Sequence, residues 1–309
     1  MPSVSWKFTV SALALIGAHA TGVARAQTMI ATKPATTALD PGSPQTEALT
    51  PVAPWVLDYG ENRCTMSRAF GREDAPIYLT LQKTTPGDLV DYAILGSDLR
   101  PNTREPVEAY FFPGDPVATI KSSYRVGRGD TEGLLFASKI NLSGEAGADA
   151  ELSASEIAAL RNGKERAVEF FELRSGLREP LTFATGSMHE PLAALRACVD
   201  DLMRGHGVDP AVLEKATSRA KTKDPMRWLR AIVREVPGGR WNGTVTMTMI
   251  VDVEGKVEQC WSRLPEPGEG AAAFVCGQMM KRARFEPAQD EEGNPIKDYT
   301  NFSFTFSNR

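Results

Sequence analysis

Few residue patterns in this sequence could carry catalysis. Beyond the N-terminal apolar run only two histidines remain, His189 and His206, and both lie near predicted helix ends, where a surface position is more common than a catalytic one. The chain has no G-x-S-x-G, H-E-x-x-H or Walker motif. The acidic triplet 290–292 is typical of a solvated turn rather than of a metal site. We therefore expect a protein that is not an enzyme and that holds no cofactor or metal.

The four cysteines are the second group of residues whose side chains could carry out chemistry. An even number of cysteines in an exported chain indicates disulfide bonds, and four cysteines allow three pairings. There is no C-x-x-C motif, and the wide spacing favours structural bridges over a redox pair or metal ligands. We expect the pairs Cys64–Cys198 and Cys260–Cys276, because each pair then lies inside one predicted domain.

The N-terminus has the pattern of a secretory signal peptide. Lys7 precedes a short apolar run that ends in Ala24-Arg-Ala26, which predicts cleavage near Ala26–Gln27 and removal of residues 1–26. The alternative is an uncleaved anchor formed by residues 8–24. Cleavage would leave no stable membrane insertion, and the nearly balanced charge, −4 in 309 residues, gives no reason to expect a nucleic-acid partner.

The rest of the chain divides into four segments. Residues 27–53 are rich in Thr, Pro and Ala and are predicted to be a disordered leader. Residues 54–207 contain short, partly alternating apolar runs, which predict a β-rich domain of unknown activity, closed by a helix that carries Cys198. Residues 208–239 are charged and are predicted to be a helical linker.

Residues 240–309 carry the clearest pattern. Alternating Val and Met residues, a turn at Glu254-Gly255 and a returning strand predict a β-hairpin, which is followed by a helix around Cys276. The last strand places Phe302, Phe304 and Phe306 on one face. The predicted fold class is α+β, with a β-rich N-terminal domain and a small β-β-α-β C-terminal domain.

This C-terminal segment, about residues 240–306, resembles the C-terminal domain of TonB-type energy transducers. The order of its motifs carries the resemblance: Gly243-Thr-Val245, Val251-Asp-Val-Glu-Gly255-Lys-Val257, Arg282-Ala-Arg-Phe285-Glu-Pro287-Ala288, Gly293-Asn-Pro295 and Phe304-Thr-Phe306. The sequence departs from the family before the first strand, where Pro237-Gly-Gly-Arg-Trp241 replaces the usual Tyr-Pro. A folded domain also stands where a transducer has a long Pro-rich rod.

The resemblance implies binding of a partner strand at the edge of the sheet. The implied contact residues are Asn301, Phe302, Ser303, Phe304, Thr305 and Phe306, unless this strand is only core or its edge is covered by the N-terminal domain. We therefore expect a periplasmic protein that binds a protein partner, for which the resemblance supplies an outer-membrane TonB-dependent receptor as the candidate. Two alternatives are a membrane-anchored energy transducer and an enzyme or small-ligand binder in residues 54–207.

Overall fold

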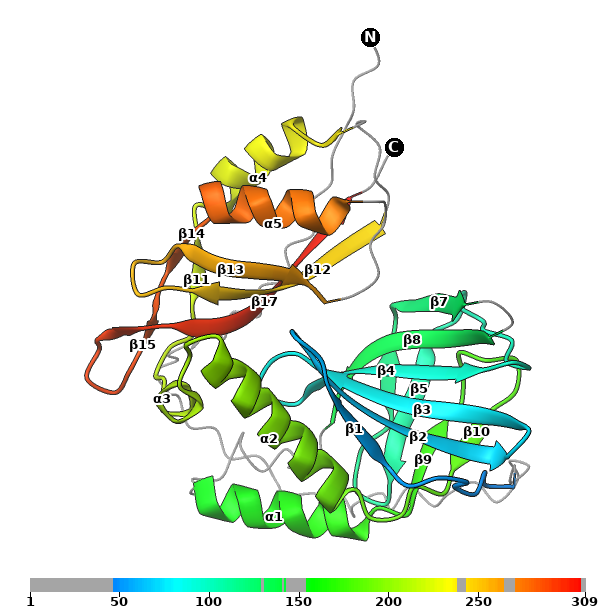
Figure 1. The fold of residues 1–309 in the computed structure, drawn as a ribbon. Helices are drawn as coiled ribbons and strands as arrows, with labels where there is room; N and C mark the ends of the chain where they lie inside the picture. Colours follow the sequence, from blue (N-terminus) through cyan, green and yellow to red (C-terminus); the bar gives the residue numbers. More distant parts are fainter. Residues whose placement is uncertain are drawn as a thin grey trace, which may run out of the picture.

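The structure, a computed structural model, describes residues 47–128, 131–140, 142, 154–237, 243–263 and 270–306. The predicted signal peptide 1–26 and the anchor alternative 8–24 lie outside the described residues. The described chain has an α+β fold, as expected from the sequence. Figure 1 shows a strand-rich unit with helices at one end and a smaller unit in which two helices cover a sheet.

The larger unit contains a six-stranded antiparallel sheet in the order β1-β2-β3-β4-β8-β7. Apolar side chains recur at every second residue, as Leu79 and Leu81 do on β3 and Tyr92 and Ile94 do on β4, so they share one buried face. The strands are β1 (Val56–Tyr59), β2 (Cys64–Arg72), β3 (Ala75–Lys83), β4 (Leu89–Gly96), β7 (Ser123–Arg128) and β8 (Thr131–Lys139).

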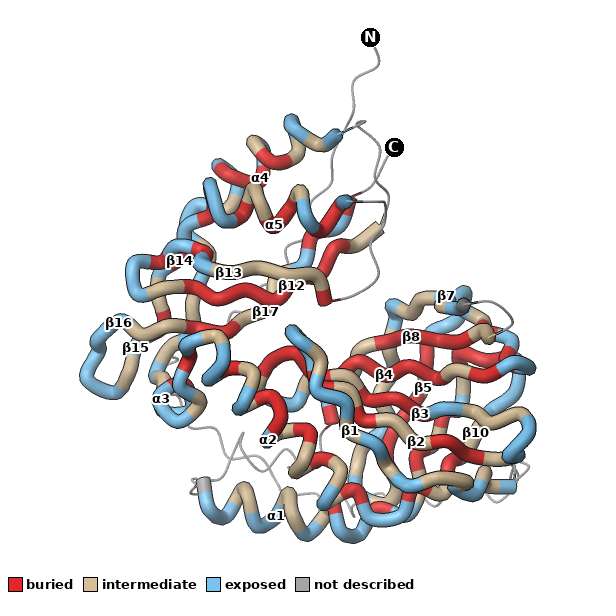
Figure 2. Tube along the Cα trace, in the orientation of Figure 1, coloured by how far each residue is buried: buried red, intermediate tan, exposed pale blue. Residues whose placement is uncertain are grey.

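A four-stranded sheet packs against this buried face and completes a β-sandwich. Its order is β10-β9-β5-β6, with β5 (Val107–Phe112), β6 (Ala118–Ile120), β9 (Phe170–Leu173) and β10 (Leu181–Phe183). Aromatic rings fill the space between the sheets. Tyr92 stacks on Phe136 at 5.1 Å and on Phe171 of the opposite sheet at 5.4 Å, and both phenylalanines are buried. Figure 2 shows the buried residues concentrated along these strands.

The described end of the predicted leader is attached to this sandwich. Leu49 bridges Phe183 of β10, and the Leu49 N–H donates to the Thr182 carbonyl at 2.7 Å. Pro51 bridges Phe70 of β2, so the chain links one strand of each sheet. The prediction of disorder for 27–53 is therefore wrong for residues 49–51, because backbone hydrogen bonds need no apolar periodicity in the segment that makes them.

Two helices close one end of the sandwich. Helix α2 (His189–Gly205) buries Leu192, Leu195, Val199 and Met203 against the core, and α1 (Ala154–Ala167) packs beside it. Cys198 of α2 forms a disulfide with Cys64 of β2, at a sequence separation of 134 residues. The expected closing helix and its bridge to an early strand are both present.

The segment 208–239 differs from the predicted helical linker. Its described part, residues 208–237, contains two short helices and a strand: α3 (Pro210–Glu214), β11 (Lys221–Lys223) and α4 (Pro225–Arg234). Strand β11 pairs with β14 (Arg284–Glu286), and α4 buries Trp228 and Ile232 in the core of the smaller unit. This part of the segment is therefore integral to the smaller unit, which begins well before residue 240.

The smaller unit is built on a three-stranded antiparallel sheet in the order β13-β12-β17. These strands are β12 (Gly243–Val251), β13 (Val257–Ser262) and β17 (Asp298–Phe306). Helix α5 (Ala271–Arg282) covers β12 and β13, and a disulfide joins its Cys276 to Cys260 of β13. The short strands β15 (Ala288–Gln289) and β16 (Pro295–Ile296) form a hairpin between β14 and β17.

The face of this sheet that lies opposite the helices packs on the sandwich. Ile250 and Tyr299 belong to the same buried cluster as the sandwich core. Arg263 donates to both carboxylate oxygens of Asp91 at 2.7 and 2.8 Å, and the two side chains are only 5% and 1% exposed. Burial raises the pKa of the Asp91 carboxyl, and Arg263 opposes that shift. The two units therefore share a buried, charged interface.

Candidate functional site

Strand β17 lies at the edge of its sheet. All nine of its residues pair with β12, from Asp298 opposite Val251 to Phe306 opposite Gly243. Within the described residues no strand pairs with the other side of β17. This is the edge at which the sequence predicts that a partner strand binds, so its backbone groups and its surroundings decide whether the site is usable.

The register identifies which backbone groups of β17 are unpaired. In an antiparallel strand the N–H and C=O of one residue point to the same neighbouring strand, and successive residues alternate between neighbours. The Thr246 carbonyl accepts from the Arg263 N–H at 2.8 Å, so Thr246 points toward β13. The adjacent residues of β12 therefore point toward β17, where Phe302 and Phe304 are their partners. Ser303 and Thr305 must then direct their N–H and C=O groups outward.

A second contact agrees with this alternation at the start of the strand. Arg219 donates from Nη2 to the Tyr299 carbonyl at 2.9 Å, so Tyr299, another odd-numbered residue, also points away from β12. The preceding residue Asp298 is fully buried, and its carboxylate accepts from Arg219 and from the Ala220 N–H. The segment at 219–220 therefore occupies the first part of the edge, and the open part begins beyond it.

The N-terminal unit approaches β17 at one residue of the predicted contact set. The Asn301 amide donates to Thr85 Oγ1 at 3.0 Å and accepts from Thr248 Oγ1 at 2.8 Å. Its side chain is therefore held in the interface between the two units. Ser303 and Thr305 are exposed, so the interface leaves the last part of the edge open.

The three phenylalanines lie on one face of β17, as the alternation predicts. Phe304 and Phe306 are buried and Phe302 is partly buried. Trp228 of α4 packs against this row, with its ring 5.6 Å from that of Phe302 and 6.2 Å from that of Phe304. Helix α4 thus packs on β17 through Trp228, whereas α5 packs on β12 and β13.

One flank of α4 is apolar and partly open. Met226, Leu229 and Val233 recur at i, i+3 and i+7, and helical geometry places them on the flank turned away from Arg227 and Ala231, which face α5. Met226 is 41% exposed and Val233 is partly exposed. This flank belongs to the helix whose Trp228 contacts Phe302 and Phe304 of β17.

His206 forms part of the interface near the other end of the sheet. Its ring lies 4.7 Å from the ring of Trp261 and 6.0 Å from that of Tyr299. Burial lowers the pKa of His206 from its ordinary value of 6.5, and the charge of Glu61 opposes this shift. The neutral imidazole is therefore the form that the interface favours, and its ring packs against Trp261 and Tyr299.

The lowered pKa of His206 predicts a pH dependence of stability. The unfolded chain takes up the proton first as the pH falls, so this contribution is complete above about pH 6.5 and is lost below it. We expect the free energy of unfolding to fall between about pH 7 and about pH 5, and to fall less in His206→Asn. Urea unfolding of both proteins at several pH values measures this difference. Identical pH slopes for the two proteins would contradict the role given to His206.

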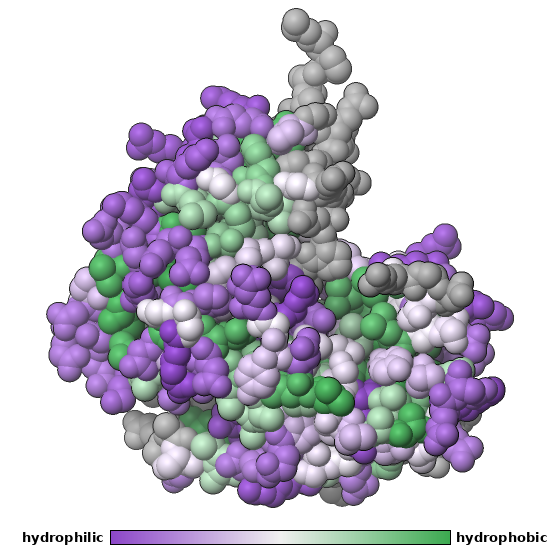
Figure 3. All heavy atoms as spheres, in the orientation of Figure 1, coloured by the Kyte–Doolittle hydropathy of each residue, from purple (hydrophilic) through white to green (hydrophobic). Residues whose placement is uncertain are grey.

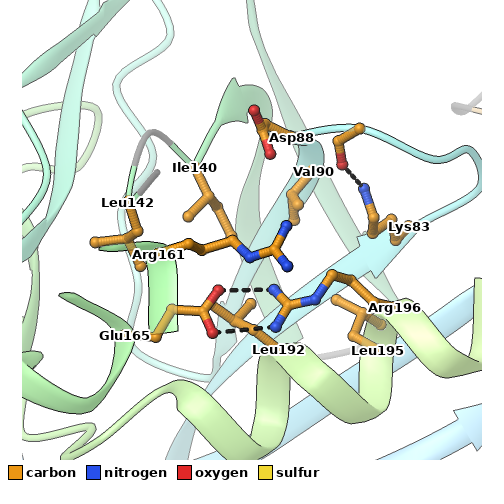
Figure 4. Close-up of a pocket in the computed structure, with 11 residues that line it drawn as sticks. Lys83, Asp88, Val90, Ile140, Leu142, Arg161, Glu165, Leu192, Leu195 and Arg196 are labelled. Atoms are coloured by element: carbon orange, nitrogen blue, oxygen red, sulfur yellow. Dashed lines mark hydrogen bonds and ion pairs between the residues drawn. The ribbon is translucent and has the colours of Figure 1, made fainter. Parts of the chain in front are cut away.

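A small polar cavity lies in the N-terminal unit beside α1 and α2 (Figure 4). Its volume is about 30 Å³, enough for one or two waters. Lys83 is 4% exposed and donates to the Gly87 carbonyl. Burial lowers the pKa of Lys83 to about 8, although the carboxylate of Asp88 opposes this shift. Perturbed ionisable groups of this kind are common at functional sites and also occur in structural networks.

Two arginines share this cavity with one buried carboxylate. Glu165 accepts from both terminal nitrogens of Arg196, at 2.7 and 3.0 Å, and from His189 Nδ1 at 3.3 Å. The Arg161 guanidinium points between Asp88 and Arg196 in Figure 4, and its buried Nε has no hydrogen-bond partner among the described residues. The cavity is therefore richer in cationic groups than in anionic ones.

Sequence reasoning did not find the residues of this cavity. Lys83 ends β3, whereas Arg161 and Arg196 lie on two helices, and no fixed spacing connects them. The only feature of the local sequence that could indicate burial of these charged residues is their position next to apolar runs. The interface pair Asp91–Arg263 was missed for the same reason, since its members are separated by 172 residues.

The remaining chemical candidates take structural or surface positions. Glu291 and Glu292 are exposed in the turn between β15 and β16, and the Asp290 carboxylate accepts from the Asn294 N–H at 2.7 Å. Within the described residues no group of three or more His, Cys, Asp or Glu side chains could hold a metal ion. The two disulfides indicate an oxidising, non-cytoplasmic compartment. The described part of the chain also lacks any helix long and apolar enough to cross a membrane.

Comparisons of the chain with protein-family profiles, curated proteins and solved structures found no match.

Proposed function

We propose that this protein is a non-catalytic, exported protein of the cell envelope that binds a protein partner by strand addition at β17. The observation that carries the proposal is the outward direction of the Ser303 and Thr305 backbone groups beside an otherwise paired strand. An extended segment of a partner can bond to such groups, and the main-chain hydrogen bonds then supply much of the affinity.

The surroundings of the edge give this binding mode a source of specificity. A guest strand beyond β17 would direct alternate side chains toward the side of the sheet that carries α4, where Trp228 contacts Phe302 and where Met226 and Val233 are exposed or partly exposed. Its other side chains would lie on the face that carries the exposed residues Ser303 and Thr305, whose hydroxyl groups bond to Thr246 and Thr244 of β12. The site therefore suits a segment that is apolar on one face and polar on the other.

The resemblance of the C-terminal segment to TonB-type domains supports a partner in the outer membrane. It suggests an extended segment of a TonB-dependent receptor as the guest strand and the periplasm as the location. An energy transducer would use the same edge but would need residues 8–24 as an anchor. The N-terminal residue of the protein from its native host separates these two proposals: Gln27 identifies an exported protein without an anchor, and Met1 identifies a transducer.

A variant that removes one outward N–H tests the proposal. Proline at position 303 leaves the ladder with β12 intact, because the Ser303 N–H points away from β12. We expect a photoreactive residue in place of Thr305 to cross-link one partner in the native host, and Ser303→Pro to reduce the cross-link about tenfold or more. The matched variant Ser303→Ala keeps the N–H and should retain the cross-link.

Two outcomes would count against strand addition. One is an undiminished cross-link in Ser303→Pro. The other is an equal yield of the same product from a photoreactive residue at Asp58 on β1, an exposed strand at the edge of the other sheet. The mass of the cross-linked peptides also identifies the segment of the partner.

The polar cavity favours a second candidate function, binding of a small anionic ligand in the N-terminal unit. The supporting observation is Arg161, whose buried Nε has no hydrogen-bond partner among the described residues, in a cavity that Arg196 and the buried Lys83 also line. Ser303→Pro distinguishes the two functions, because it changes the edge of β17 and leaves the cavity residues untouched. An activity or ligand affinity that persists in this variant while partner binding is lost belongs to the cavity.

A further inference from the structure

A groove separate from the β17 edge opens on the helical side of the smaller unit. It lies between α4, the end of α5, β14 and the β12–β13 turn, and its volume is about 550 Å³. Trp228 and Phe285 line it together with the rim residues Lys223, Arg227 and Arg284. Both aromatic residues are largely buried, at 4% and 5% exposure, and the three rim residues are exposed. The groove thus has an apolar floor and a basic rim.

The positive charge of the rim is poorly compensated within the described residues. Lys223 and Arg227 have no ion-pair partner there, and Arg284 donates only to backbone carbonyls. Among the acidic residues that line the groove, Glu254 already pairs with Lys256, which leaves Asp224. The sequence explains this excess, because residues 215–234 contain seven Lys or Arg residues and a single acidic one, in a chain whose net charge is −4.

The surface of the smaller unit is hydrophilic over this part of the fold. In Figure 3 hydrophilic residues cover the area that α4 and β14 occupy in Figure 1. Exposed cations with no carboxylate partner attract an anionic partner, and the attraction is screened by salt. A concave shape with an aromatic floor favours a chain that can enter the groove over a flat anionic membrane surface.

We infer that this groove binds an acidic peptide segment of a partner protein. Carboxylates of the peptide would meet Lys223, Arg227 and Arg284, and an apolar side chain would contact Phe285 and the exposed part of Trp228. The inference does not depend on strand addition, because none of these residues belongs to β17. It assigns the smaller unit a second surface that selects partners by charge.

The test uses a short fluorescein-labelled peptide of alternating glutamate and alanine around one phenylalanine. We expect it to bind the full chain, to bind more weakly as salt is added, and to lose about tenfold in affinity for the double variant Lys223→Glu, Arg227→Glu. The control Lys121→Glu, Lys139→Glu makes the same change in net charge at two exposed lysines of the other unit. It should bind like the unaltered protein.

Several results would overturn the inference. A matching peptide with glutamine in place of glutamate must bind much more weakly. Equal affinities of the two peptides would show that the groove does not recognise the negative charge of the glutamates. Equal losses in the groove variant and the control variant would mean that only overall charge matters. Loss of peptide binding in Ser303→Pro would place the peptide on β17. Absence of peptide binding together with binding to phosphatidylglycerol vesicles, lost in the groove variant, would assign the surface to a membrane.

Discussion

Replacing Arg263 with alanine is expected to lower the free energy of unfolding by about 3–5 kcal/mol. The reason is that Asp91 would remain buried at 1% side-chain exposure without the guanidinium that now binds both of its oxygens. Denaturant unfolding of Arg263→Ala against the unaltered protein measures the change. A loss below about 1 kcal/mol, the range of exposed ion pairs, would contradict the buried interface between the two units.

Two further variants test whether the loss in Arg263→Ala comes from the unpaired buried charge of Asp91. Arg204→Ala removes an exposed ion pair with Asp201, and we expect it to change stability by less than about 1 kcal/mol. The double variant Asp91→Leu, Arg263→Met removes both charges and should recover most of the stability lost in Arg263→Ala. Buried ion pairs are often replaceable by apolar side chains at little cost. If the double variant is as unstable as Arg263→Ala, the loss of stability comes from disturbed side-chain packing and not from the unpaired charge of Asp91.

Removal of the Cys64–Cys198 disulfide is the second change with a large expected effect. The bridge closes a loop of 134 residues, and the loss of loop-closure entropy predicts a destabilisation of about 5 kcal/mol for Cys64→Ala, Cys198→Ala. The bridge also holds α2 on β2, so closure of the sandwich depends on it. Denaturant unfolding without a reducing agent measures the change.

The second disulfide provides the matched control. Cys260 and Cys276 are separated by 16 residues, for which the same relation gives about 3 kcal/mol. We therefore expect Cys260→Ala, Cys276→Ala to be the milder double variant. The reverse order would show that the long loop is already restricted in the unfolded chain, and that loop length does not set the contribution of the first bridge.

Local features of the smaller unit could be predicted from the sequence because neighbouring residues determine them. The hairpin turn at Glu254-Gly255 requires a positive φ, and Gly255 has φ +78°. A Cβ at this position would lie 2.0 Å from the Phe285 carbonyl oxygen, so glycine is also needed for the approach of β14. The helix around Cys276 and the last strand follow in the same way from the period of their apolar residues.

Features that depend on distant parts of the chain could not be predicted in the same way. Thr246 and Thr248 alternate with Val and Met along β12, a pattern that usually indicates a solvated polar face. Both threonines are buried, because the N-terminal unit packs on that face of the sheet. Periodicity shows that a strand has two different faces, but it does not show what covers each of them.

The candidate site was likewise predicted only in part. The position of the final strand and its phenylalanine row follow from alternation, and Phe304 and Phe306 are buried as that pattern requires. The segment 219–220 beside Asp298, the contact of Asn301 with Thr85 and the cover by α4 all come from residues distant in sequence. These contacts restrict the open edge to the last few residues of β17.

Amide hydrogen exchange along β17, measured by NMR with and without the partner segment identified by cross-linking, tests strand addition most directly. In the free protein the Ser303 and Thr305 amides should exchange quickly, whereas those of Phe302 and Phe304, bonded to β12, should exchange slowly. The partner segment should slow exchange at Ser303 and Thr305 and change Phe302 and Phe304 little. Partner binding that leaves Ser303 and Thr305 in fast exchange would contradict strand addition at this edge.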